Sequence, residues 1–116
     1  MARFTIVDRE GVRDGETGLV WERCPAGDPL PWPQALEADE AGWRLPGIDA
    51  LMAFLLALRD DHPCGAQPEP GVWWSASRSP FAPSGWARAV ETGTGRGPAV
   101  VLREVGRAAR RWRVRG

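Results

Sequence analysis

The chain has 116 residues, the size of one domain with its own core, so we expect a single domain over residues 1–116. Its 15 basic residues, all arginines, balance 15 acidic residues, and zero net charge argues against general binding to nucleic acid or to a membrane surface. Seven tryptophans and no tyrosine are unusual, and we expect most of the indoles to lie in the core.

Charge is divided unevenly along the chain. Residues 1–58 hold five Arg and ten acidic residues, a net −5, whereas residues 59–116 hold ten Arg and five acidic residues, a net +5. The two halves are therefore expected to attract each other within the domain. The N-terminus has no apolar signal core and no stretch could span a membrane, so a full-length chain is expected in the cytoplasm. A trimmed chain would instead be secreted or held at the cell surface.

The first part of the chain is predicted to contain short strands. Residues 4–7 are typical of a first strand, and Asp14-Gly15 indicates a hairpin that returns through residues 17–22. Pro33 is typical of the first turn of a helix, which we expect over residues 34–39.

The strongest local signal is Trp43-Arg44-Leu45-Pro46 together with the helix that follows it. Trp43 and Leu45 alternate with Arg44, which predicts an extended piece that ends before Pro46. A helix is then expected near residues 48–59. Its apolar residues recur at helical spacing and are Ile48, Leu51, Met52, Leu55 and Leu58.

The remaining part of the chain is predicted to hold strands separated by loops. The strands are expected at residues 72–75 and 86–90, the loops at 62–71 and 77–85, and a final hairpin at 100–103 and 109–114. Strands, two helices and then strands predict an α+β fold with a mainly antiparallel sheet.

Three motifs follow one another in an order that is specific when they are taken together. They are Thr17-Gly18-Leu19-Val20-Trp21, Trp43-Arg44-Leu45-Pro46 and Trp73-Trp74-Ser75-Ala76-Ser77. Arg3-Phe4, Val12-Arg13-Asp14 and Arg111-Trp112-Arg113-Val114-Arg115 accompany them. In these pieces nearly the whole chain resembles the Lcl C-terminal domain family of bacteria, whose namesake is part of a collagen-like surface adhesin.

The resemblance implies a C-type lectin-like fold, in which two helices flank a small twisted antiparallel sheet and the terminal strands are paired. It also implies that the motif residues are structural, with Arg44 tying backbone or carboxylate groups together. These structural residues are Trp21, Trp43, Arg44, Leu45, Pro46 and Trp74. Members often carry an aromatic, Asn-rich segment where this chain has residues 91–97, and that difference counts against a glycan-binding platform.

Enzymatic and metal-dependent functions find little support in the sequence. The chain has no Asn, and Glu69-Pro70 is the only partial match to the calcium ligands of C-type lectins. Cys24, His62 and Cys64 are three possible zinc ligands without the close-spaced pairs of a structural site. A distant relation to formylglycine-generating oxidases would require a reactive cysteine pair, which the placement of these cysteines does not match. No metal or cofactor is therefore expected.

The leading hypothesis is a non-enzymatic binding module that presents loops 62–71 and 77–85 to a protein or glycan partner. Arginine and tryptophan are common interface anchors. The candidate contacts are Trp73, Arg78, Phe81, Trp86 and Arg88. The alternative is a polyanion binder, for example of sulfated glycans, through Arg111, Arg113 and Arg115, which alternate and so share one strand face. Pairing of these arginines inside the domain competes with that role.

Overall fold

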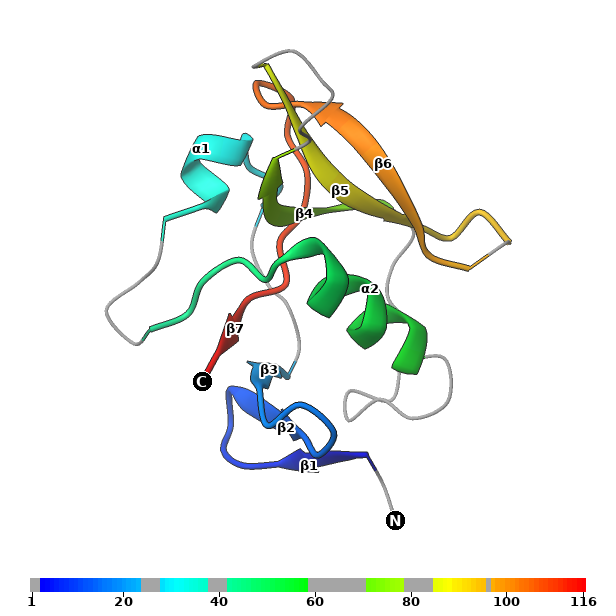
Figure 1. Ribbon diagram of the computed structural model, residues 1–116. Coiled ribbons are helices and arrows are strands. Elements are labelled where there is room, and N and C mark those ends of the chain that lie inside the picture. The colour runs from blue at the N-terminus through cyan, green and yellow to red at the C-terminus, as the bar shows by residue number, and fades with distance from the viewer. Residues whose placement is uncertain (1–2, 24–27, 38–41, 59–70, 79–84, 96) are drawn as a thin grey trace.

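Two small antiparallel sheets and two helices form the fold in the computed structural model (Figure 1). The structure describes residues 3–23, 28–37, 42–58, 71–78, 85–95 and 97–116. The predicted α+β class with antiparallel pairing is confirmed, although the strands form two sheets where one was expected. In the described part of the chain no helix is long and apolar enough to cross a membrane.

The first sheet brings the two ends of the chain together. In spatial order its strands are β1 (Phe4–Ile6), β2 (Gly11–Asp14), β3 (Val20–Glu22) and β7 (Val114–Arg115). The predicted hairpin at Asp14-Gly15 is confirmed, and the Asp14 N–H donates to the Leu19 carbonyl at 2.8 Å. The expected pairing of the terminal strands is wrong, because β7 pairs with β3 while β1 pairs only with β2. The register sets Trp21 beside Val114, so two buried side chains meet in the core.

The second sheet has fewer strands than the first, but these strands are longer, and the sheet lies between the two helices (Figure 1). Its strands, in spatial order, are β4 (Gly71–Arg78), β5 (Trp86–Thr92) and β6 (Ala99–Glu104). Side chains of opposite faces enter different core clusters. Trp73 and Val90 pack with the long helix, whereas Trp74, Ala87 and Ala89 pack with the short one.

The long helix agrees with its prediction and the short one differs from it. The helix expected near residues 48–59 is α2 (Ile48–Ala57), and the extended piece before Pro46 is also confirmed, because Arg44 forms a β-bridge with Val114. The helix expected over residues 34–39 is α1 (Trp32–Ala35). It ends early because the Glu37 N–H bonds the Gln34 carbonyl, one residue nearer than a helix would use.

The segment between β6 and the C-terminus ties the molecule together (Figure 1). It does not form the predicted hairpin with residues 100–103, because β6 pairs with β5. Instead it bonds successively to Leu30, to β4 on both sides of Trp73, to β3, and to Arg44. These partners come from both sheets and from the segments before both helices. The sequence therefore predicted correctly that residues 109–114 are extended, but the segments that they pair with are distant in the chain.

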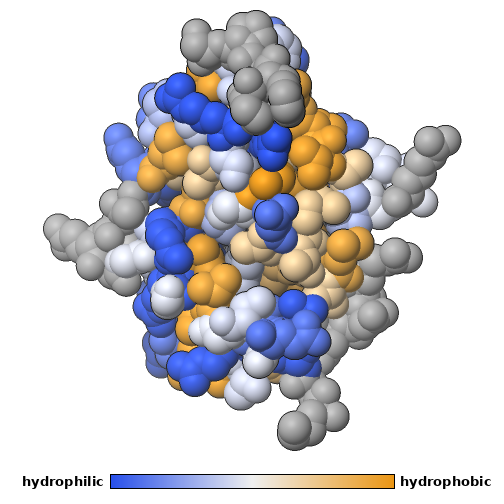
Figure 2. Space-filling view, viewed as in Figure 1, coloured by the Kyte–Doolittle hydropathy of each residue, from blue (hydrophilic) through white to orange (hydrophobic). Residues whose placement is uncertain are grey.

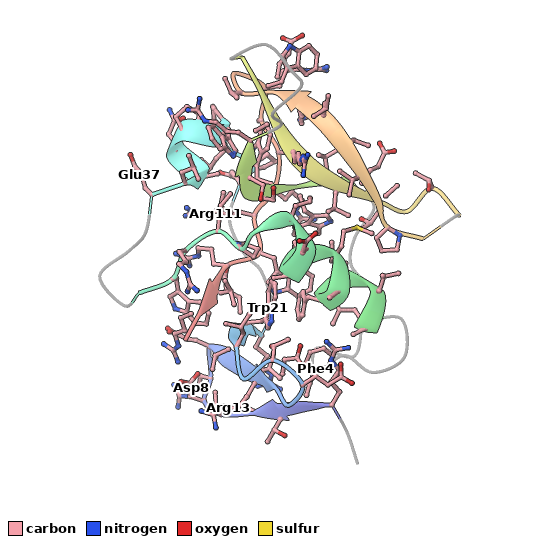
Figure 3. All side chains as sticks on the ribbon, in the orientation of Figure 1. Phe4, Asp8, Arg13, Trp21, Glu37 and Arg111 are labelled. Atoms are coloured by element: carbon pink, nitrogen blue, oxygen red, sulfur yellow. The ribbon has the colours of Figure 1, made fainter. Side chains whose placement is uncertain are left out.

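Six of the seven tryptophans are buried, which confirms the expectation that most indoles form the core. In one cluster the Trp21 ring stacks on the Phe54 ring with centroids 3.9 Å apart. Phe4 and Trp112 meet the Phe54 ring edge-on. Figure 3 shows Phe4 and Trp21 reaching from the first sheet toward α2. Trp86 is the exception and is half-buried.

Candidate interaction surface

Among the expected contact residues, Trp73 does not reach the surface. It is 1% exposed, and its indole N–H donates to the Thr92 hydroxyl at 3.1 Å. On its other side it meets the Trp112 ring at 5.3 Å and the Arg110 guanidinium at 4.9 Å. Its place in β4 explains the correction, because both faces of this strand pack against a helix and so both Trp73 and Trp74 are core residues.

Arg78 lies apart from the other candidate contacts. It ends β4 opposite Ala87, and its guanidinium lies 5.0 Å from the centre of the Trp32 ring on the α1 side of the sheet. Phe81 and almost all of the two loops predicted to bind a partner fall outside the described residues. The sequence prediction for those loops therefore stays a prediction.

Trp86 and Arg88 share the α2 side of β5. Residues directly opposite each other in an antiparallel pair point to the same face, and Arg88 is paired with Leu102 and Trp86 with Glu104. Both candidate residues are half-buried, and Leu102 is 49% exposed. The Arg88 guanidinium has no hydrogen-bond or ion-pair partner within the described ranges of the chain. Trp86, Arg88 and Leu102 thus form one continuous strip, the Trp86–Arg88 face.

Exposed aliphatic side chains extend this face toward α2. Val100 on β6 is 50% exposed, and Leu56 on α2 is 46% exposed. The outward side of α2 also carries Ala53, while half-buried Met52 packs against the core, so this helix is apolar nearly all round although one side meets solvent. Figure 2 shows apolar colour gathered over the part of the surface where α2 and β6 lie. Sequence reasoning missed these residues because alternation predicts a strand but does not say which side stays uncovered.

Two of the three C-terminal arginines are engaged in ion pairs with the acidic N-terminal half. Arg113 binds Glu22 through its backbone N–H at 2.7 Å and its Nε at 3.0 Å. Arg115 donates to Asp8 at 2.8 Å and lies 4.5 Å from the centre of the Trp43 ring. Burial alternates as predicted, since Trp112 and Val114 are buried between the partly exposed arginines. The attraction expected between the two halves is therefore realised by these pairs.

The carboxylates of the first sheet are held in the charged form. Arg3 donates two hydrogen bonds to Asp14, at 2.8 and 2.9 Å, and these lower the pKa of that buried carboxyl. At the β1–β2 turn the backbone N–H groups of Glu10 and Gly11 donate to Asp8 and lower its pKa, and Arg115 adds to the effect. These hydrogen bonds favour the charged form of both carboxyl groups and so stabilise the fold.

The motif residues join separate parts of the fold. Trp43, Leu45 and Pro46 are buried, and Arg44 exchanges backbone hydrogen bonds with Val114 while its guanidinium donates to the same carbonyl at 3.3 Å. Pro46 accepts the Ala76 N–H at 2.7 Å, which fixes β4 against the start of α2.

The serines of the tryptophan-rich motif complete this junction. Ser77 Oγ accepts the first N–H of α2, from Ile48, at 3.0 Å, so it caps a helix that has no cap of its own. Ser75 Oγ donates to the Arg88 carbonyl at 2.8 Å and holds β4 to β5 across the irregular register near Arg78. The motif therefore supplies both core indoles and backbone contacts.

Metal chemistry finds no site in the part of the molecule that the structure describes. Within it, no group of three or more His, Cys, Asp or Glu side chains could hold a metal ion. Cys24, His62 and Cys64, the three ligands considered from the sequence, lie outside the described residues.

Comparison with known proteins gives no relative. No protein-family model matches the chain. No curated protein and no solved structure is significantly similar to it. Function must therefore be argued from the geometry of this chain alone.

Proposed function

We propose that this chain is a non-enzymatic protein-interaction module with a C-type lectin-like fold, similar to the Lcl C-terminal domain family. The motif order in the sequence supports the family. The pairing of β3, from the N-terminal part, with the C-terminal strand β7 is compatible with a C-type lectin-like fold, in which the two ends of the chain lie in one sheet. The observation that carries the interaction role is the Trp86–Arg88 face. It sets a half-buried indole beside exposed Leu102, together with the Arg88 guanidinium, which has no ion-pair partner among the described residues.

The chemistry of this face favours a protein partner. Exposed apolar patches rimmed by polar groups mark interaction sites, and Trp and Arg dominate the energetics of interface cores. Aliphatic neighbours such as Val100 and Leu102 would gain from burial against a protein but offer few hydrogen bonds to a sugar. The glycan alternative is therefore an outcome to be tested.

The polyanion-binding alternative has weaker support. Arg113 and Arg115 are neutralised by Glu22 and Asp8, and a polyanion would have to displace these carboxylates. Arg111 alone has no ion-pair partner in the described part of the chain, and one arginine does not make a polyanion site. Binding to heparin that weakens steeply with salt would revive this alternative.

The test compares wild-type protein with the Trp86→Ala/Arg88→Ala double variant in affinity capture from cell extract, quantified by mass spectrometry. Arg13→Ala is the matched control, because Arg13 is an exposed arginine in the other sheet. We expect specific partners to be retained by the control and depleted at least about tenfold by the double variant. If every captured protein is retained by the double variant, or if a glycan array alone gives binding, the protein-partner proposal is wrong.

A further inference from the structure

The two sheets have four outer strands, and the fold covers two of them. The outer side of β7 is closed by Arg44, and the outer side of β4 is closed by Arg110, which bonds backbone groups of both Val72 and Trp74. β1 is only three residues long, and such short edges resist pairing with other chains. That leaves β6, whose six residues have no strand on the outer side in the described part of the chain.

The free backbone groups of this edge can be assigned from the register. Val105 donates its N–H to Gly85 at 2.9 Å, so this pair continues the β5–β6 ladder as a hydrogen-bonded pair. Bonded and non-bonded pairs alternate along antiparallel strands, so residues 99, 101 and 103 direct their backbone groups toward β5. Residues 100, 102 and 104 therefore direct theirs outward. The outward positions include the two exposed large hydrophobic side chains of the strand, Val100 and Leu102.

The β6 edge lacks the usual protection against pairing. Its pairing with β5 runs without a bulge from Glu104 to Ala99, and the strand contains no Pro and no Lys. Arg103 does not guard the edge, because its guanidinium donates back to the Ala108 carbonyl. A long, regular and apolar edge of this kind is a template for another strand.

We propose that β6 is a self-association site, at which two copies of this chain pair β6 with β6 in antiparallel orientation about a two-fold axis at Val101. This register sets Val100 opposite Leu102 of the second copy, so each of the two apolar side chains is covered by the other. The outward N–H and C=O groups of Val100 and Leu102 then form four hydrogen bonds between the copies.

The strand is complementary to itself at its ends as well. Glu104 lies opposite Pro98 of the second copy, and the carbonyl of Glu104 already accepts the Arg107 N–H at 3.1 Å. Pro98 has no N–H to offer that carbonyl, but its own carbonyl can accept the outward N–H of Glu104. Arg103 lies opposite Ala99 of the second copy, so no like charges meet across the axis. Because the formal net charge of the chain is zero, two copies do not repel each other through their net charge. This fit favours a second copy over an unrelated strand.

Pairing would join the two three-stranded sheets into one of six strands with both α2 helices on the same face. A single strand pair is a small interface, so we expect a dissociation constant on the order of 10–500 μM. The self-association shares Leu102 with the Trp86–Arg88 face but is carried by the outward backbone groups of β6, so a different assay tests it.

The experiment is sedimentation equilibrium from about 10 μM to about 1 mM protein. The mass of the wild-type protein should rise from 12.7 kDa toward twice that value. Leu102→Pro should remain monomeric, because proline removes an outward N–H that β5 does not use and places its ring at the outer edge. Leu102→Lys tests the same edge by charge should the proline variant fail to fold. Ile6→Lys is the matched control, since Ile6 is equally exposed, at 50%, but lies on β1.

The expected result is dimerisation of the wild type and of Ile6→Lys, with at least a tenfold weaker association for the folded Leu102 variants. A wild-type protein that stays monomeric throughout the range would overturn the proposal. So would Leu102 variants that dimerise as well as the wild type, or an Ile6→Lys variant that loses dimerisation.

Discussion

Replacing Trp112 with alanine should destabilise the domain more than removing any other single side chain of the C-terminal segment. Trp112 is 1% exposed and lies where this segment crosses the core. Its ring meets Phe54 edge-on at 4.9 Å and Trp73 at 5.3 Å. Its indole N–H also donates to the Glu22 carbonyl on β3 at 2.6 Å. One side chain thus connects α2, β4 and the first sheet.

The size of the effect follows from these contacts. Truncating a buried aromatic side chain to alanine lowers the free energy of unfolding by about 3–5 kcal/mol. Loss of the hydrogen bond to Glu22 adds about 1 kcal/mol. A chain of 116 residues is expected to be stable by about 6–17 kcal/mol, so this loss would leave a domain at the low end of that range barely folded.

The assay is urea unfolding followed by far-ultraviolet circular dichroism, which does not depend on the indole that is removed. Trp112→Phe keeps a ring against Phe54 but loses the N–H, and we expect it to lose about 1–2 kcal/mol and stay measurable if the alanine variant unfolds. Half-buried Trp86 supplies the control, and Trp86→Ala should lose under about 2 kcal/mol. A loss for Trp112→Ala no larger than that for Trp86→Ala would refute the reasoning.

Two further predictions concern the first sheet. Gly11→Ala should lower the free energy of unfolding by about 1–3 kcal/mol, because the new Cβ would lie 2.7 Å from buried Val20. Gly85→Ala is its control, because the new Cβ meets no atom of the described residues within 4 Å, and it should be neutral within about 0.5 kcal/mol. Urea midpoints of the two variants check this, and equal midpoints would contradict it. Because Arg3 lowers the pKa of Asp14, the stability that this carboxylate provides is present above about pH 4 and is lost as the pH falls through its folded pKa. Asp14→Asn should therefore flatten the acid side of the stability–pH profile, and an unchanged acid side would count against this role of Asp14.

Local patterns in the sequence were enough to place the main elements. The helical spacing of Leu51, Leu55 and Leu58 and the proline before them predicted α2, and the Asp-Gly step at Asp14 predicted the first hairpin. Each of these signals reflects residues within a few positions of one another. Such elements can be predicted because their hydrogen bonds close locally.

Partners distant in the chain could not be predicted in the same way. Backbone hydrogen bonds carry no side-chain signature, so the pairing of residues 109–114 with Leu30, β4 and β3 could not be distinguished from a local hairpin. For the same reason the burial of Trp73 was missed, since it depends on whether a helix covers one face of β4 or both. The open edge of β6 could not be predicted for the same reason, because only the sheet order shows that no strand of the described residues lies beyond it.

We propose that β6 stays open for a second copy, whereas the C-terminal segment closes the outer side of β4 and Arg44 closes the outer side of that segment's own strand, β7. Amide hydrogen exchange by NMR at about 10 μM and about 1 mM protein tests it most directly. The amides of Trp74 and Val114, which bond to this segment or belong to it, should exchange slowly at both concentrations. The outward amides of Val100 and Leu102 should exchange rapidly in the dilute sample and several times more slowly in the concentrated one. Exchange at Val100 and Leu102 that does not change with concentration, or rapid exchange at Trp74 and Val114, would contradict the account.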